Sequence, residues 1–253
     1  MTTPFNRCLP LIQYTTVRFT PLWITMVALV TLLSVTMQSA QAGSREDMLH
    51  FFDTVIFGSE IAPSMRQTVV AKWPKGRIIT FAYHGQPQTK HLRWTVRHIT
   101  QIANLTKRPF RHITGPERAQ ADFHIFYLPG HAMDKIKLPG VPQQLLSHLS
   151  RSNGCYFVTK KNQYRDIASA YIVVNIDRSD ESINACILEE ITQAMGLPND
   201  TDMMRGSVFN DRERLTRLGM RDIQLIKLLY DDRMVAGMSR TAALKRAQEL
   251  LNE

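Results

Sequence analysis

Two carboxylates and an amide stand close together in the stretch CILEEITQAMGLPND, residues 186–200. Glu189 and Gln193 are one turn apart on a predicted helix and therefore share a face, while Glu190 lies one position round the helix. Adjacent glutamates that are partly buried can share a proton and act as acid and base. Oxygen ligands of this kind also suit Ca²⁺, Mg²⁺ or Mn²⁺. The plain alternative is a solvated helix face.

The helix that carries these groups is predicted for about residues 182–196. Four apolar side chains recur at every fourth position and should form a ridge facing the core: Ile183, Ile187, Ile191 and Met195. Asp180 or Ser182 can cap the start of the helix. Gly196 favours an end in the left-handed conformation, and Pro198 prevents the helix from continuing.

This run resembles the zinc-binding helix of zincin metallopeptidases, whose pattern is His-Glu-x-x-His. In that pattern two histidines one turn apart bind Zn²⁺, and the glutamate takes a proton from the bound water. Glu190 stands at the general-base position, and Gly196 is in register with the glycine of the extended metzincin pattern. The resemblance implies four candidate metal ligands at or beside the ligand positions: Glu189, Gln193, Asn199 and Asp200.

The resemblance continues on both sides of the helix, over roughly residues 88–231. ADFHIFYL looks like the inner strand of a metzincin-type sheet, and SAYIVVNI like the strand before the active helix. SVFND stands where the turn below the metal would come, and RLGMRDIQLIKLLYD is similar to the closing helix of the matrixin group. The chain also resembles an uncharacterised proteobacterial family of secreted proteins, catalogued as a domain of unknown function, with the same Glu-Glu-x-x-Gln-x-x-Gly-Leu-Pro-Asn-Asp run.

The candidate ligands are a poor match for zinc. Zn²⁺ prefers imidazole and thiolate, whereas the amide oxygens of Gln193 and Asn199 are weak zinc ligands. All eight histidines precede the motif, the last being His148. His124, on the predicted inner strand, is the one histidine to consider as a replacement, although a lone strand histidine is more often a packed or surface residue. We therefore expect no cofactor, with a divalent metal at a non-histidine site as the alternative.

The first 42 residues have the composition of an export signal. Arg7 and Arg18 occur without any acid, an apolar run follows at residues 21–37, and a small-x-small site predicts cleavage after Ala42. The alternative is an N-terminal membrane anchor, although the run is slightly shorter than the ~20 residues that a spanning helix prefers. Both interpretations place residues 43–253 in the periplasm or outside the cell.

Cys155 and Cys186 remain after cleavage, and an even count in an oxidising compartment predicts a disulfide, with two buried thiols as the alternative. Residues 43–253 carry 29 basic and 22 acidic side chains, a net charge of +7. The charges are dispersed and no nucleic-acid-binding motif is present, so we expect no nucleic-acid partner. Outside the cytoplasm a basic surface can attract anionic lipid, lipopolysaccharide or peptidoglycan carboxylates, or simply be solvated.

The remaining elements indicate an α+β fold. β-Branched and aromatic runs predict strands at RIITFAY, ADFHIFYL, CYFVTK and ASAYIVVNID. Helical spacing predicts further helices at residues 45–60, 89–108, 141–151, 218–231 and 239–253, the last capped by Ser239. We expect a single zincin-like domain over residues 43–253, with a small mixed sheet packed on helices.

These features lead to three functional hypotheses. The first is an exported, non-catalytic binding module that holds a peptide or cell-wall fragment against the edge strand AYIVVNI by strand addition. The second is a hydrolase, either an atypical metallopeptidase or a wall-cleaving enzyme, that uses Glu189, Glu190 and Gln193. The third is a structural partner in an envelope complex.

Overall fold

The computed structural model describes residues 44–59, 64, 66–152 and 154–253, which belong to one compact unit. The predicted signal or anchor at residues 1–42 lies outside the described residues. Within the part that is described, no helix is long and apolar enough to cross a membrane.

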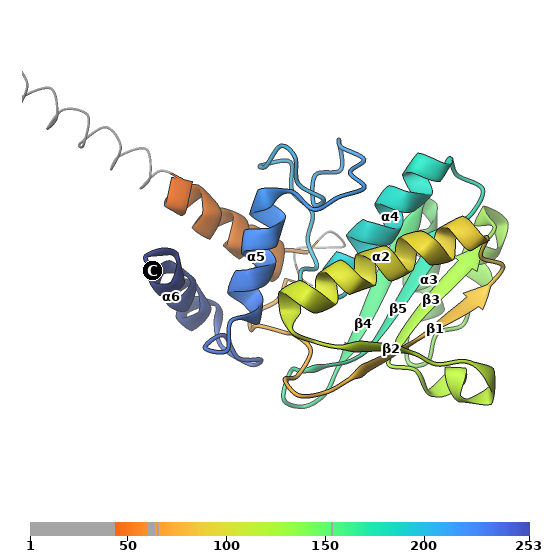
Figure 1. Ribbon diagram of the computed structural model, residues 1–253, viewed down its shortest axis with the longest axis horizontal. Coiled ribbons are helices and arrows are strands. Elements are labelled where there is room, and N and C mark those ends of the chain that lie inside the picture. Colours follow the sequence, from red (N-terminus) through yellow and green to blue (C-terminus); the bar gives the residue numbers. More distant parts are fainter. Residues whose placement is uncertain (1–43, 60–63, 65, 153) are drawn as a thin grey trace, which may run out of the picture. The chain divides into compact units, whose positions relative to one another are not determined.

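A five-stranded sheet in the order β2-β1-β3-β5-β4 forms the centre of the unit (Figure 1). The strands are β1 Ile79–Gly85, β2 Phe110–His112, β3 Phe123–Leu128, β4 Cys155–Lys161 and β5 Ile167–Asn175. The first four strands in this order are parallel, and β4 is antiparallel to β5. The predicted α+β class with a mixed sheet is therefore confirmed.

The prediction that AYIVVNI forms an edge strand is wrong. β5 lies between β3 and β4, and its Tyr171, Ile172, Val173 and Val174 are all buried. A continuous apolar run of this kind is typical of a strand with neighbours on both sides. The edge strand is β4, which ends in the exposed Lys160 and Lys161, as edge strands often do. The opposite edge is formed by β2, which is three residues long and was not predicted from the sequence.

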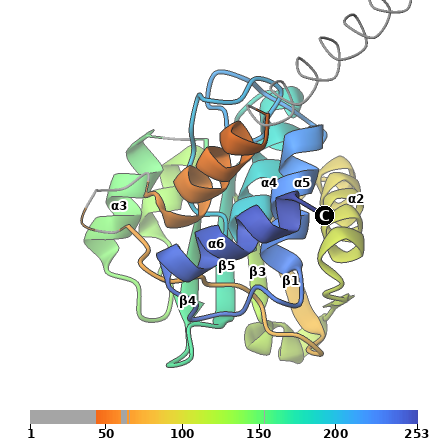
Figure 2. The same ribbon diagram turned by 90° about the vertical axis from the view of Figure 1, so that its left-hand side faces the viewer.

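Helices cover both faces of the sheet. Residues 44–57 are helical, followed by α2 Thr89–Thr106, α3 Gln143–Ser152, α4 Asp180–Gln193, α5 Met220–Tyr230 and α6 Arg240–Leu251. α2 and α4 lie side by side on one face (Figure 1), and α3 packs on the other. The 44–57 helix, α5 and α6 lie together, as Figure 2 shows. Ser239 caps α6 as predicted, accepting a hydrogen bond from the Ala242 amide at 3.3 Å.

The alternation of side chains along β3 assigns its two faces. Phe123, Ile125 and Tyr127 are buried in the main core, together with the apolar side of α4. His124 points to the other face, where its ring stacks on Tyr171 with centroids 5.0 Å apart. The one histidine considered as a replacement metal ligand therefore lies across the sheet from the motif helix.

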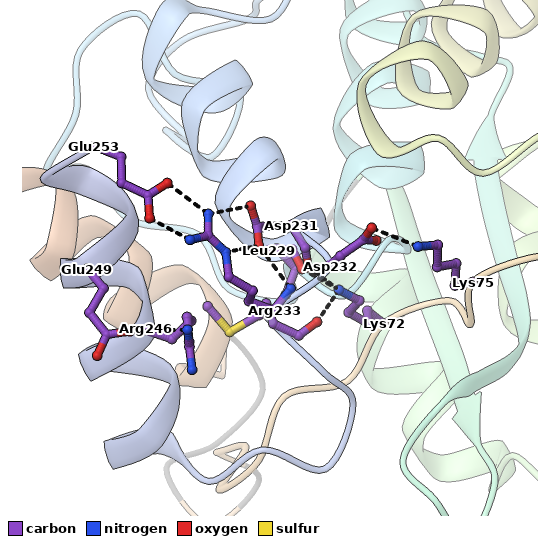
Figure 3. A network of polar contacts seen from close by, with 10 residues as sticks. Lys72, Lys75, Leu229, Asp231, Asp232, Arg233, Arg246, Glu249 and Glu253 are labelled. Atoms are coloured by element: carbon purple, nitrogen blue, oxygen red, sulfur yellow. Dashed lines mark hydrogen bonds and ion pairs between the residues drawn. The ribbon is translucent and has the colours of Figure 1, made fainter.

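A polar network joins the segment before β1 to the end of α5 (Figure 3). Lys72 is buried, and its ammonium group donates to the carbonyl oxygens of Leu229, Asp231 and Met234. Arg233 connects Asp231 to the chain terminus at Glu253. Burial lowers the pKa of Lys72 to about 8, and the positive charge of Arg108 adds to this effect. The three carbonyls compensate the buried ammonium by hydrogen bonding.

His84 and His124 form a pair on the face of the sheet where α3 packs. We expect this pair to make the stability of the protein depend on pH. Nε2 of His84 lies 2.9 Å from Nδ1 of His124. Burial lowers the pKa of His84 to about 4, and the like charges of His124 and Arg118 contribute. The pKa of histidine in an unfolded chain is ~6.5. The contribution of neutral His84 to the unfolding free energy is therefore fully present above that pH and is lost as the pH falls towards 4.

We therefore predict that between pH 7 and pH 4 the wild-type protein loses ~1–2 kcal/mol more unfolding free energy than His84→Gln, after allowance for solvent screening. Urea unfolding at several pH values measures this difference. His148→Gln, which changes an exposed histidine on α3, should follow the wild-type curve. Parallel curves for wild type and His84→Gln would contradict the prediction.

Candidate functional site

The motif helix α4 begins earlier and ends earlier than predicted, at Asp180 and Gln193. Its cap is Ser179, whose hydroxyl accepts from the Ser182 amide at 3.3 Å, so the prediction of a cap at Asp180 or Ser182 is wrong. Asp180 instead lies in the first turn, where a carboxylate is favoured by the helix dipole. The predicted ridge is confirmed, since all four members are buried in the main core: Ile183, Ile187, Ile191 and Met195.

The C-terminal end of α4 is held by two side chains from other elements. The Trp73 indole donates to the Ala194 carbonyl at 3.0 Å, and the Tyr230 hydroxyl donates to the Met195 carbonyl at 2.8 Å. Burial raises the pKa of Tyr230, which keeps its phenol protonated as a donor. Gly196 follows with φ +103°, and a Cβ there would lie 2.1 Å from the Ala71 carbonyl oxygen, so the predicted glycine end is confirmed.

A cleft of about 420 Å³ runs along the open edge of β4. α4 forms one wall and presents Glu189 and Glu190 to the space, and α3 contributes Leu145 and Leu149 on the other side. Glu189 is half-buried, while Glu190 is only 5% exposed. The two glutamates therefore lie at the wall of a cavity, and the alternative of a fully solvated helix face does not describe them.

The predicted disulfide between Cys155 and Cys186 is confirmed, with Cα atoms 6.0 Å apart. It joins the first residue of the edge strand to the middle of α4, and both cysteines border the cleft. The bond therefore fixes the distance between β4 and α4 at this point.

Three carboxylates meet where the cleft passes the end of α4. Oxygen atoms of Glu189, Asp200 and Asp211 all lie within 4.8 Å of one another, a spacing that could hold a metal ion. Asp200 is half-buried and Asp211 is exposed. Two of these residues are sequence-predicted candidates. Asp211 is an addition, and its position in the SVFND turn was the signal that could have found it.

The other two candidate ligands, Gln193 and Asn199, form hydrogen bonds that position the residues around them. The Gln193 amide nitrogen donates to an Asp200 carboxylate oxygen at 2.7 Å and so orients that carboxylate. The Asn199 side chain donates to the carbonyls of Thr54 at 3.1 Å and Asp200 at 2.8 Å. The Asn199 backbone amide also donates to Val55, so this residue attaches the 44–57 helix to the loop after α4.

The turn that carries Asp211 is fixed by a buried carboxylate on α5. Asp222 is 0% exposed and accepts hydrogen bonds from the Ser207 hydroxyl at 2.6 Å and the Val208 amide at 3.1 Å. It also accepts from the Gly219 amide at 2.8 Å, at the start of its own helix. Burial raises the pKa of Asp222, and the three donors oppose that rise. The position of Asp211 therefore depends on α5 packing correctly.

Zinc does not fit this donor set. Among the described residues, the group with metal-ligand spacing is made of carboxylates and contains neither histidine nor cysteine. Zn²⁺ sites in proteins rely on imidazole and thiolate, whereas an all-oxygen set suits Ca²⁺, Mg²⁺ or Mn²⁺.

Comparison with known proteins places the chain in a family. Residues 45–248 match the family described as "Protein of unknown function (DUF2927)". The chain belongs to this family. No curated protein matches the DUF2927 chain. Among solved structures, that of myroilysin is similar over 53% of this chain and 54% of its own, with 14% identity and a TM-score of 0.30, so the chain spans about half the length of myroilysin.

We predict that Cys155→Ala/Cys186→Ala lowers the unfolding free energy of the DUF2927 chain by ~3–4 kcal/mol, because the lost cross-link spans 31 residues. Urea unfolding under oxidising conditions measures this loss. Reductant should bring the wild type to the level of the double variant and leave the variant unchanged. A difference below ~1 kcal/mol between the oxidised proteins would show that the bond adds little.

Proposed function

We propose that this protein is an exported cell-envelope protein that binds an extended peptide, including the peptide part of a cell-wall fragment, without catalysing its cleavage. In this proposal residues 1–42 direct export to the periplasm or cell exterior, or anchor the protein, and residues 43–253 form one zincin-like domain. The observation that carries the proposal is the position of β4, which is both the edge of the sheet and a wall of the cleft.

The pairing of β4 with β5 determines which backbone groups face the cleft. The Asn175 amide donates to the Gly154 carbonyl at 2.8 Å, which makes these residues a hydrogen-bonded pair of the antiparallel ladder. Such pairs alternate along the strand. Cys155, Phe157 and Thr159 therefore direct their amides and carbonyls outward. No strand of the described residues pairs with this edge, so an extended peptide can add to it by main-chain hydrogen bonds.

The charges along the cleft suit a peptide that has groups of both signs. Arg178 lies against the start of β4, since a Cβ at Gly154 would be 3.3 Å from its guanidinium carbon. The carboxylates of Glu189, Asp200 and Asp211 lie further along the cleft, and Lys161 stands at the far end. A peptide has a polar main chain and can have side chains of both charges, so it can match this succession of positive, negative and positive groups along the cleft.

Four features support the zincin-like part of the proposal. ADFHIFYL forms an inner strand, and SAYIVVNI belongs to the strand that directly precedes α4. The SVFND turn brings Asp211 to the motif helix, and the closing helix α5 holds the end of α4 through Tyr230. These four segments are the ones that carry the resemblance, and their arrangement supports this part of the proposal.

The test of peptide binding is Thr159→Pro, which removes an outward amide and leaves the bonds to β5 in place. We predict at least about tenfold weaker binding of an acetylated, amidated pentapeptide of alternating valine and threonine, because one strand-addition bond is lost and the ring obstructs the edge. Fluorescence anisotropy with labelled peptide measures the affinity.

Thr159→Val is the matched control, since it keeps the amide and the β-branched shape, and it should bind like the wild type. Urea unfolding should place both variants within ~1 kcal/mol of the wild type. Equal affinity of Thr159→Pro and Thr159→Val would contradict strand addition, as would a wild type that binds no such peptide.

The three-carboxylate group favours a second candidate function, a hydrolase that uses Ca²⁺, Mg²⁺ or Mn²⁺. Glu189, Asp200 and Asp211 would hold the cation, whose chemistry there would be to lower the pKa of bound water. Glu190 borders the same cleft and is next to Glu189 in the chain, so it would be the proton acceptor. This candidate differs from the first in requiring a bound cation.

For this candidate we predict that Glu189→Gln and Asp211→Asn each weaken Mn²⁺ or Ca²⁺ binding by at least about tenfold, since each removes one of three charged ligands. Isothermal titration on protein purified without chelator measures binding, and elemental mass spectrometry measures the metal that is carried through. Glu181→Gln, an exposed change on the same helix, should leave binding unaltered. A wild type that binds none of these cations would rule out the metal-dependent hydrolase.

A further inference from the structure

A second cavity, of about 200 Å³, opens beyond the Lys161 end of the cleft. Three of its lining side chains are cationic, and we call the space they enclose the basic pocket: Arg66, Lys161 and Arg165. Gln67 and Thr68 add polar groups to the lining. No carboxylate is among the described residues that line it, which distinguishes it from the centre of the cleft. A cavity whose described lining has three cationic side chains and no acidic one attracts an anion.

The basic pocket is continuous with the cleft through two shared residues. Gln67 and Lys161 line both cavities. The Lys161 ammonium donates to the Gln67 side-chain oxygen at 2.7 Å, which holds it at the boundary between the two spaces. Although the Lys161 side chain is exposed overall, desolvation of its ammonium group by neighbouring protein atoms lowers its pKa, and the nearby charge of Arg165 lowers it further. An anion that entered the basic pocket would relieve the repulsion between these cations.

Arg165 is held in an unfavourable backbone conformation at the hairpin between β4 and β5. Its φ is +70°, in the left-handed region that glycine and asparagine prefer. The Asn162 side chain accepts hydrogen bonds from the Tyr164 amide at 2.9 Å and the Asp166 amide at 3.0 Å, and so fixes the turn. Arginine at this position costs stability relative to glycine, and such strain is concentrated at functional positions.

We propose that the basic pocket binds a carboxylate of the peptide that lies in the cleft. The preferred ligand then has an acidic residue or a free C-terminal carboxylate at the Lys161 end. This assignment rests on the proposed function of the cleft. Arginine matches a carboxylate with two parallel N–H donors, and Lys161 adds a third charged contact. Main-chain pairing along β4 does not distinguish sequences, whereas a charged pocket at its end does.

The experiment uses the full chain and three acetylated, amidated pentapeptides of alternating valine and threonine. One has glutamate at its first position, one has glutamate at its last position, and one has glutamine at both. We predict that one glutamate peptide binds at least about fivefold more tightly than the glutamine peptide, because a charge-assisted contact between arginine and carboxylate is present in only one of the two complexes. The end at which glutamate is effective gives the direction of the added strand.

Two variants remove a cation from the basic pocket. Arg165→Gly places glycine where φ is positive, so it should raise the melting temperature while abolishing the preference for glutamate. Arg66→Gln should also abolish the preference. Arg93→Gln, an exposed change of the same charge on α2, should keep it. A wild type without the preference, or an Arg165→Gly protein that retains it, would overturn the proposal.

A titration with sodium acetate separates failure of the pocket from failure of the cleft. If no pentapeptide binds but acetate shifts the Nε–Hε NMR signals of Arg66 and Arg165 and not that of Arg93, the pocket remains a carboxylate site and strand addition is rejected. If acetate shifts none of these signals, the pocket assignment falls as well. Inorganic phosphate that binds more than about tenfold more tightly than acetate, with no glutamate preference, would assign the pocket to phosphate groups and overturn the proposal.

Discussion

The last carbonyl groups of α4 are buried, and the arrangement of the cleft depends on how they are satisfied. A helix end leaves carbonyls without intrahelical partners, and burying them unpaired would cost several kcal/mol, at ~1–3 kcal/mol for each group. Trp73, just before β1, and Tyr230, at the end of α5, supply the donors. Because these side chains come from segments far apart in the sequence, two hydrogen bonds fix α4 against both the sheet and α5. Gly196 then turns the chain back beneath Ala71, which brings Asp200 to the same side as Glu189.

What the sequence could predict was local. The apolar ridge of α4, its glycine end at Gly196 and the pairing of Cys155 with Cys186 follow from spacing, backbone preference and cysteine count. The edge of the sheet could not be predicted in this way, because strand order is decided by pairings between distant segments. Asp211 was missed for a similar reason, since its approach to Glu189 depends on a turn held by Asp222 from another helix. The helix can therefore be predicted from local sequence, whereas the site depends on tertiary packing.

The oxygen donors of the motif and the apolar ridge of α4 occupy different sides of the helix. The ridge residues face the core and Glu189 faces the cleft, so the packing of the helix against the core does not depend on the polar group at position 189. Glu189 places a carboxylate at the wall of the cleft, and the carboxylates of Asp200 and Asp211 lie beside it. Like charges this close repel one another and are stabilised together only by a cation or by donors such as Gln193. Either a hard cation or a cationic group of a ligand satisfies this requirement.

The disulfide and the strained hairpin lie at the two ends of the edge strand β4, the surface that we propose binds a peptide. The bond from Cys155 joins β4 to α4 at the start of the edge strand. In the proposed function, this cross-link would reduce the conformational entropy that is lost on binding. Main-chain pairing along a rigid edge supplies affinity but reads no sequence. Selectivity must then come from side chains beyond the paired segment, and Arg165 stands there in a conformation that a structural turn would assign to glycine. An arginine at that φ is understandable if its charge is used, because glycine would relieve the backbone strain of the turn.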